Sequence, residues 1–245
     1  MIKIRTTFCI SIFLLISALF SGIASAEDSL ISVILSRRQS IVGIKGVQGG
    51  LMKSPQPSAV IDKSSGRMLI SRGVRAAYYS KSGAGIIITS SGYIVTNLHI
   101  IMGAKNIIVE LYDSSSYPAE VALAYPQHDL AIIKIKASIE LHPIPLADSN
   151  KAQLGEQVIN IGHSPYLKET LSAGKIISLA KSRLTGEVEI IKVNINLYKG
   201  DSGGPLFNRS GELIGIVSAQ LKSQDRSTLA IPSNKIVNLA SDLIK

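Results

Sequence analysis

The order of three short segments constrains the fold of this chain more than any other feature. Residues 200–204 read Gly-Asp-Ser-Gly-Gly, so Ser202 stands among glycines that allow a tight turn and the close approach of another group. A histidine, His99, and an aspartate, Asp129, stand earlier in the chain. A hydroxyl, an imidazole base and an orienting carboxylate are the parts of a nucleophilic triad. The sequence therefore predicts that these three side chains meet in space.

The chain order of the triad excludes one of the three folds considered, and a second would need an aspartate in an unfavourable segment. In α/β-hydrolases the histidine follows the serine, but all four histidines here precede Ser202. The subtilisin order, with the aspartate first, would require Asp62, which lies in a Ser- and Lys-rich stretch. The order His99, Asp129, Ser202 is that of chymotrypsin. The separations, 129 − 99 = 30 and 202 − 129 = 73, leave room for one hairpin and then most of a second barrel.

The first 26 residues have the pattern of an export signal. Lys3 and Arg5 precede an apolar run over residues 8–20, and Ala-Ser-Ala at 24–26 is a cleavage pattern. The alternative is an uncleaved membrane anchor, but the apolar run is short. Cleavage would leave 245 − 26 = 219 residues with a net charge of +9 − 2 = +7 and without Cys9, the one cysteine. We expect a bacterial periplasmic or secreted protein whose core holds it without disulfides.

Short Ile- and Val-rich segments with turns between them predict an all-β fold of two six-stranded antiparallel β-barrels, with a short N-terminal helix and a C-terminal helix. We expect the domain to span residues 27–245, with the first barrel at about 40–147 and the second at about 153–232. A closing helix is expected at 233–244, with Ser233 as its cap. The N-terminal helix is expected at 28–38. Residues 49–82 are interpreted as a long loop with one hairpin at 67–79.

The motifs resemble those of the trypsin-like serine proteases, and within them the HtrA (Deg) family of exported proteases. The similarity extends from about residue 28 to the last residue. Its pieces, in the order of that family, are 82–88, 92–99, 129–134, 155–162, 200–206, 211–216 and 230–234. The resemblance implies the chymotrypsin-like pair of barrels with an active site between them, and it places His99, Asp129 and Ser202 at the catalytic positions.

The chain also departs from the family pattern. Leu98 stands where alanine is usual, Asp201 replaces a common asparagine, and Tyr198 and Lys199 are unusual before the nucleophile. The PDZ modules that often follow such a protease are expected to be absent, since the chain ends about a dozen residues after Pro232.

Trypsins suggest a further possibility, activation by cleavage. There a new Ile-Val terminus pairs with the aspartate before the nucleophile, and the equivalents here would be Ile41 and Asp201. The cut would have to fall two residues beyond Arg38, and the start of the HtrA family is not cut. We therefore expect Ile41 to begin a barrel strand.

Each triad residue has an expected role. His99 would take the proton of Ser202, Asp129 would hold the imidazole, and the amides of Gly200 and Ser202 would bind the oxyanion. The substrate pocket is expected to be lined mainly by small and apolar residues, favouring Val, Ala or Leu before the cleaved bond. Its predicted residues are Asn196, Leu197, Tyr198, Ile216, Ser218 and Ala219.

No metal or cofactor is predicted, because His128, His142 and His163 lack metal-ligand spacing. His128 is expected to point away from the site if its segment is extended. The expected partners are protein or peptide substrates, without nucleic acid and without stable membrane insertion after signal cleavage; the oligomeric state is left open. Two alternatives stay open: a scaffold with weak or absent activity, and a glutamate-specific protease. Relatives of the latter use a histidine near Ser218, and this chain has none after His163.

Overall fold

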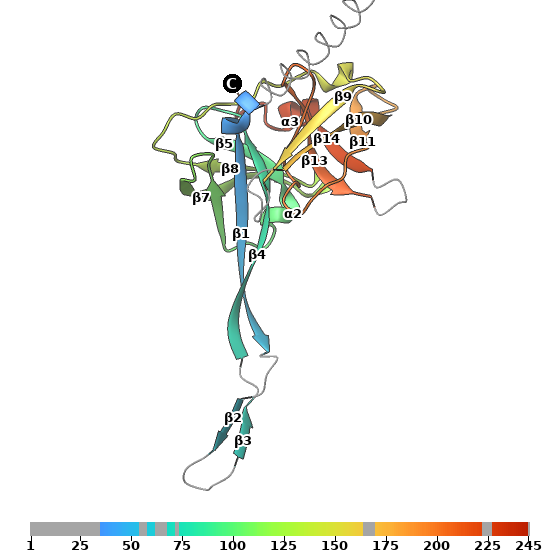
Figure 1. The fold of residues 1–245 in the computed structure, drawn as a ribbon. Helices are drawn as coiled ribbons and strands as arrows, with labels where there is room; N and C mark the ends of the chain where they lie inside the picture. The colour runs from blue at the N-terminus through green and yellow to red at the C-terminus, as the bar shows by residue number, and fades with distance from the viewer. Residues whose placement is uncertain are drawn as a thin grey trace, which may run out of the picture.

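The protein consists of two closed antiparallel barrels, as the sequence predicts (Figure 1). The structure, a computed structural model, describes residues 35–53, 58–61, 68–71, 74–163, 170–221 and 227–244, with side chains described outside residues 49–80. The first barrel closes in the strand order β1-β4-β5-β8-β7-β6. Its strands are β1 (Ile41–Lys53), β4 (Val74–Ile87), β5 (Tyr93–Asn97), β6 (Asn106–Glu110), β7 (Ser116–Tyr125) and β8 (Leu130–Ile135).

The second barrel closes in the order β10-β11-β14-β13-β12-β9. Its strands are β9 (Gln157–Gly162), β10 (Thr170–Lys181), β11 (Val188–Val193), β12 (Pro205–Phe207), β13 (Leu213–Gln220) and β14 (Thr228–Pro232). The helical pieces are short: α2 (Leu98–Ile101), α3 (Ser233–Leu239) and three 3-10 turns, η1 (Arg38–Ser40), η2 (Pro126–His128) and η3 (Ser149–Lys151).

Three apolar clusters hold the barrels. One fills the first barrel and another fills the second, and the third lies between them. Strand β8 is buried on both of its faces. Ile132 faces the cluster between the barrels, whereas Ile133 faces the interior of the first barrel. Phe207 of the second barrel packs in the shared cluster without solvent exposure. Burial on both faces explains the run of apolar residues in this strand, and the shared cluster packs the two barrels against each other.

The stretch expected to be a loop at 49–82 is instead largely strand. β1 and β4 pair over thirteen residues, from Ile41 opposite Ile86 to Lys53 opposite Val74. Beyond Val47 the pairing of β1 with β6 ends, and the two strands continue as a twisted ribbon that leaves the barrel (Figure 1). The predicted hairpin at 67–79 is also wrong, since β3 (Met68–Ser71) pairs with β2 (Ser58–Ile61) and β4 pairs with β1. Residues 49–82 are rich in Gly, Ser and Lys and lack the regular apolar alternation that predicts a strand, so the sequence does not reveal these strands.

The C-terminal helix is shorter than expected, and the N-terminal helix can be compared over its last residues only, of which 35–36 are helical. Most of the predicted helix at 28–38 lies outside the described residues, and what is described ends in the 3-10 turn η1. The closing helix α3 ends at Leu239, before the predicted limit of 244. Ser233 does not cap it; its hydroxyl donates to the carbonyl of Ala147 at 2.7 Å, and this bond ties α3 to the link between the barrels.

Candidate active site

Strand pairing brings His99 and Asp129 together. β5 runs antiparallel to β8, with Asn97 at its end opposite Leu130 at the start of β8. The residues just beyond these ends therefore meet at one edge of the first barrel. There the chain turns into α2, which carries His99, while Asp129 takes a left-handed conformation with φ of 49° after η2. The helix α2 is too short to have been predicted from periodicity.

Asp129 binds His99 through both of its carboxylate oxygens, one at the imidazole and one at the backbone N–H. Its Oδ2 lies 2.8 Å from His99 Nδ1, and its Oδ1 accepts the backbone N–H of His99 at 2.9 Å. The hydroxyl of Ser218 donates to the same Oδ2 at 2.9 Å. This arrangement leaves Nε2 of His99 as the nitrogen available for a proton from a nucleophile. Ser218 was predicted only as a pocket residue, so its bond to Asp129 is a feature that sequence reasoning missed.

The environment of Asp129 favours its ionised form. Burial raises the pKa of this carboxyl, but the hydrogen bonds from the His99 side chain and backbone and from Ser218 outweigh it, and the net pKa is below the ordinary aspartate value. His99 is open to solvent, with 42% of its side-chain surface exposed, and the Asp129 side chain with 35%. A base that must reach a polypeptide substrate needs this access.

Ser202 lies in a turn that both barrels hold. Its carbonyl accepts the backbone N–H of Ala84 on β4, at 2.8 Å, and the next residue, Gly203, donates to Val217 O on β13, at 2.8 Å. Gly203 has a φ of 81°, and a Cβ there would stand 2.2 Å from Ala84 O. Only glycine fits this position. The turn therefore fixes the hydroxyl of Ser202 at the boundary of the barrels.

The hydroxyl of Ser202 donates to the carbonyl of Ser218, at 3.4 Å. Within the described part of the chain it makes no hydrogen bond to His99. Hydrogen bonds between nucleophile and base are often long without substrate and tighten in the complex. The structure thus joins His99 directly to Asp129, and Ser218 links that carboxylate to Ser202.

The predicted oxyanion donors lie in the same turn. Gly200 has a φ of 110°, and its carbonyl accepts the N–H of His163 at 3.4 Å. Within the described residues, neither the Gly200 nor the Ser202 amide donates to a backbone carbonyl. Free amides that face a common point are what an oxyanion site requires.

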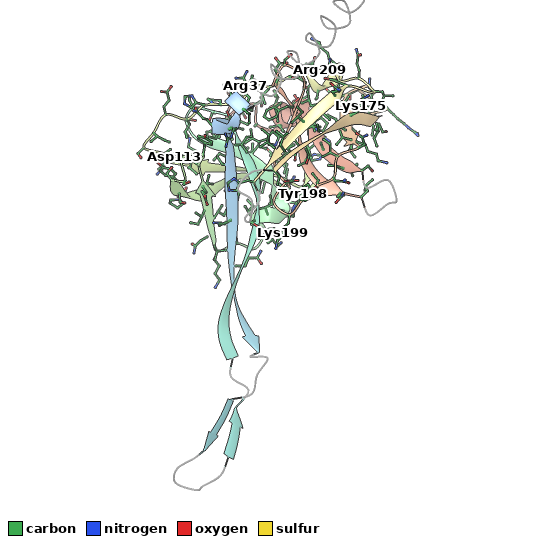
Figure 2. The ribbon with its side chains drawn as sticks, in the orientation of Figure 1. Arg37, Asp113, Lys175, Tyr198, Lys199 and Arg209 are labelled. Carbon is green, nitrogen blue, oxygen red and sulfur yellow. The ribbon has the colours of Figure 1, made fainter. Side chains whose placement is uncertain are left out.

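The predicted pocket residues are not equally placed. Ile216 is fully buried in the cluster between the barrels, so its side chain offers no surface to a substrate in this conformation. Leu197 and Ser218 are half-buried, while Asn196 and Ala219 are exposed. Tyr198 is 60% exposed. Figure 2 shows Tyr198 and Lys199 at the end of the body from which the ribbon leaves, away from Arg209 and Lys175 at the opposite end.

His128 belongs to the 3-10 turn η2 and is not in an extended segment, so the expectation based on an extended strand is wrong. It borders a cavity of about 450 Å³ beside Asp129, which also touches Ser218, Glu189 and Lys235. Burial lowers the pKa of His128 and Lys235 lowers it further, against the opposing effect of Glu189. This pKa keeps its imidazole neutral near pH 7. Of the predicted pocket residues, Ser218 alone borders this cavity.

The remaining histidines are His142 and His163, and the backbone N–H of His163 bonds to Gly200 O near Ser202. His142 is exposed on a loop, and the ring of His163 packs against Gly43, where a Cβ would stand 2.4 Å from its Nε2. In the ranges that the structure describes, no three His, Cys, Asp or Glu side chains gather as a metal site would require. No helix in those ranges is long and apolar enough to cross a membrane.

Comparison with known proteins places this site in a family. Residues 83–216, which include all three triad residues, match the trypsin-like peptidase domain. The periplasmic serine endoprotease DegP of Salmonella typhimurium is 37% identical over 169 residues, which is 66% of this chain and 36% of that protein. The periplasmic pH-dependent serine endoprotease DegQ of Escherichia coli is 36% identical over 168 residues, 66% of this chain and 37% of its own length.

The chain thus spans little more than a third of the length of the curated relatives that it matches. The family match covers more than half of this chain and coincides with the barrels and the site described above. The chain belongs to the trypsin-like serine peptidases, in the family of HtrA and DegP.

Proposed function

We propose that this protein is an exported serine endopeptidase that hydrolyses peptide bonds in unfolded or exposed protein segments. The observation that carries the proposal is the bond of 2.8 Å between His99 Nδ1 and Asp129 Oδ2, with Ser218 bonded both to that carboxylate and to the hydroxyl of Ser202. A histidine oriented in this way activates a serine, whose hydroxyl is otherwise a poor nucleophile. The names of the relatives, periplasmic endoproteases, support both the reaction and the export.

The chemistry follows from the residues in place. His99 Nε2 takes the proton of Ser202 Oγ as that oxygen attacks the carbonyl carbon of the peptide bond. Amides of Gly200 and Ser202 stabilise the negative charge on the carbonyl oxygen. The bond to the leaving amine then breaks, His99 returns the proton to that amine, and an acyl group stays on Ser202. Water, activated by the same imidazole, hydrolyses the acyl-enzyme. Asp129 stays ionised and stabilises the imidazolium, in keeping with its lowered pKa.

The finer features rest on the sequence. Residues 1–26 would direct export and be removed, so that the mature protein works in the periplasm or outside the cell. Small or medium aliphatic residues would be preferred before the cleaved bond, because the predicted pocket has Asn196 where trypsins carry an aspartate. A buried cationic side chain without a partner would cost several kcal/mol there.

A scaffold without activity is the second candidate function. One observation favours it: the hydroxyl of Ser202 donates to Ser218 O rather than to His99. A fluorophosphonate probe separates the two, because it reacts only with a serine that a base activates. We expect covalent labelling at Ser202, with none in Ser202→Ala and almost none in His99→Ala, both folded. Equal labelling of wild type and His99→Ala at a background rate would favour the scaffold.

A further inference from the structure

The carboxylate of Asp201, immediately before the nucleophile, is fully buried. Burial of a carboxylate is costly unless donors satisfy both oxygens. Oδ2 accepts the backbone N–H of Tyr198 at 2.7 Å, and Oδ1 accepts the hydroxyl of Thr170, itself a buried residue. Among the residues that the structure describes, a neutral hydroxyl and one amide hold this carboxylate.

The ends of β9 and β10 build a cradle around this carboxylate. Their register places Thr170 opposite Gly162. A Cβ on Gly162 would stand 1.8 Å from Asp201 Oδ1, so the carboxylate fills the space that any other residue would need. The position of Asp201 is therefore set by the sheet of the second barrel and not by the turn alone.

Asp201 in turn shapes the residues that precede it. Its backbone N–H donates to Tyr198 O at 3.1 Å while its carboxylate accepts the Tyr198 N–H, so two reciprocal bonds close the segment 198–201. Gly200, whose amide is the proposed oxyanion donor, lies inside this closed segment with its φ of 110°. The orientation of that amide depends on the bonds to Asp201.

The alternative partner for this carboxylate, a new terminus at Ile41, is engaged elsewhere. The N–H of Ile41 donates to Arg38 O, and its side chain packs in the cluster between the barrels. Ile41 also pairs with Ile86 in the first barrel. Freeing its nitrogen would dismantle the start of β1.

We infer that Thr170 and Asp201 form an internal latch that holds segment 198–200 in its oxyanion-binding shape, so that Thr170 is a positioning residue and cleavage at Ile41 is not needed. This inference rests on the proposed peptidase function. In an enzyme activated by cleavage, the ammonium group of the new terminus would bind the carboxylate before the nucleophile. Here the neutral hydroxyl of Thr170 binds that carboxylate instead.

The variant Thr170→Val tests the latch, because it keeps the shape and removes the hydroxyl. We expect kcat to fall by roughly tenfold to a hundredfold, the range for losing a hydrogen bond to a charged group, with KM little changed. Affinity for a peptide aldehyde, whose adduct needs the oxyanion donors, should fall in parallel, and Thr170→Ser should restore both. Thr228→Val is the matched control, since its buried hydroxyl donates to Ile195 O at 2.6 Å in the same barrel; it should lower stability and leave aldehyde affinity unchanged.

Two outcomes would overturn the latch. One is a folded Thr170→Val protein that binds the aldehyde as tightly as the wild type does. The other needs no variant: mass spectrometry of fluorophosphonate-labelled wild-type protein should show an intact bond between Ser40 and Ile41, and labelling confined to chains beginning at Ile41 would refute the proposal. Absence of labelling in wild-type protein of either form would instead contradict the peptidase function itself.

Discussion

Ser218 donates its hydroxyl to Asp129 Oδ2 at 2.9 Å, on the same oxygen that lies 2.8 Å from His99 Nδ1. Two donors at one oxygen favour the ionised carboxylate, and they contribute to its lowered pKa. An aspartate with a lowered pKa in the folded state contributes stability that is present above the ordinary aspartate pKa. That contribution is lost as the pH falls through the lowered, folded-state pKa.

Replacing Ser218 with alanine should therefore raise the pKa of Asp129. The acid-unfolding midpoint should move to higher pH, and the carboxyl resonance of Asp129, followed by NMR, should titrate at higher pH than in the wild type. Ser115→Ala is the matched control, because Ser115 makes a similar bond to Asp113 on an exposed turn. It should leave the titration of Asp129 unchanged. Unchanged titration of Asp129 in Ser218→Ala would contradict the role given to this hydroxyl.

The orientation of the imidazole gives a second prediction. Asp129→Asn should leave the fold intact and lower kcat by a factor on the order of 10⁴, because the amide favours the wrong tautomer of His99. Peptide hydrolysis with KM and kcat measured separately provides the test. A loss below tenfold would mean that His99 does not depend on Asp129 for its orientation.

Residues where the ribbon joins the barrel form hydrogen bonds to the helix α2, which carries His99, and these bonds give a third prediction. Lys81 on β4 donates to the carbonyl of His99 at 3.0 Å, and Gln48 on β1 donates to Met102 O. Both bonds fix α2 from the ribbon side. Lys81→Met keeps the apolar stem but removes the donor, and we expect it to lower kcat about fivefold, the effect of about 1 kcal/mol. Lys136→Met, an exposed change on the same barrel, should have no effect; equal rates for wild type and Lys81→Met would exclude this support.

The sequence predicted what depends on local pattern and failed where distant partners decide. Barrel strands such as β6 carry alternating burial that can be read from the residues, and the motifs around His99 and Asp129 predicted the contact between these two side chains. Bonds between distant segments, such as Ser218 to Asp129 or Thr170 to Asp201, have no signal in one sequence, because only the closed barrels bring these residues together.

Ile216 illustrates a second limit. On strand β13, Ile216 and Val217 face opposite sides of the sheet in ordinary alternation, because the register shift of this strand begins only after Val217. Both Ile216 and Val217 are fully buried, in different clusters. The prediction of Ile216 as a pocket residue failed to account for the cluster between the barrels.

The shared cluster should dominate the stability of the protein. Phe207 is the largest fully buried side chain of that cluster. Phe207→Ala should lower the free energy of unfolding by about 3–5 kcal/mol, since it removes apolar contacts and leaves a cavity. Leu184→Ala, at a position 96% exposed, should change it by less than about 0.5 kcal/mol. Urea denaturation of both variants measures the difference, and similar values for the two would contradict the placement of Phe207.

Specificity provides the last prediction. If the segment around Asn196 lines the primary pocket, cleavage of denatured proteins should follow Val, Ala or Leu, because nothing there pairs with a buried cation. Asn196→Asp adds a carboxylate at the trypsin position, and it should raise cleavage after Lys or Arg by at least about tenfold relative to the wild type. Glu120→Gln is the control, since Glu120 is exposed on β7 of the first barrel; it should leave the cleavage pattern unchanged. A wild-type pattern dominated by Lys and Arg, or by Glu, would show that the pocket is assigned to the wrong residues, and cleavage-site profiling by mass spectrometry decides between these outcomes.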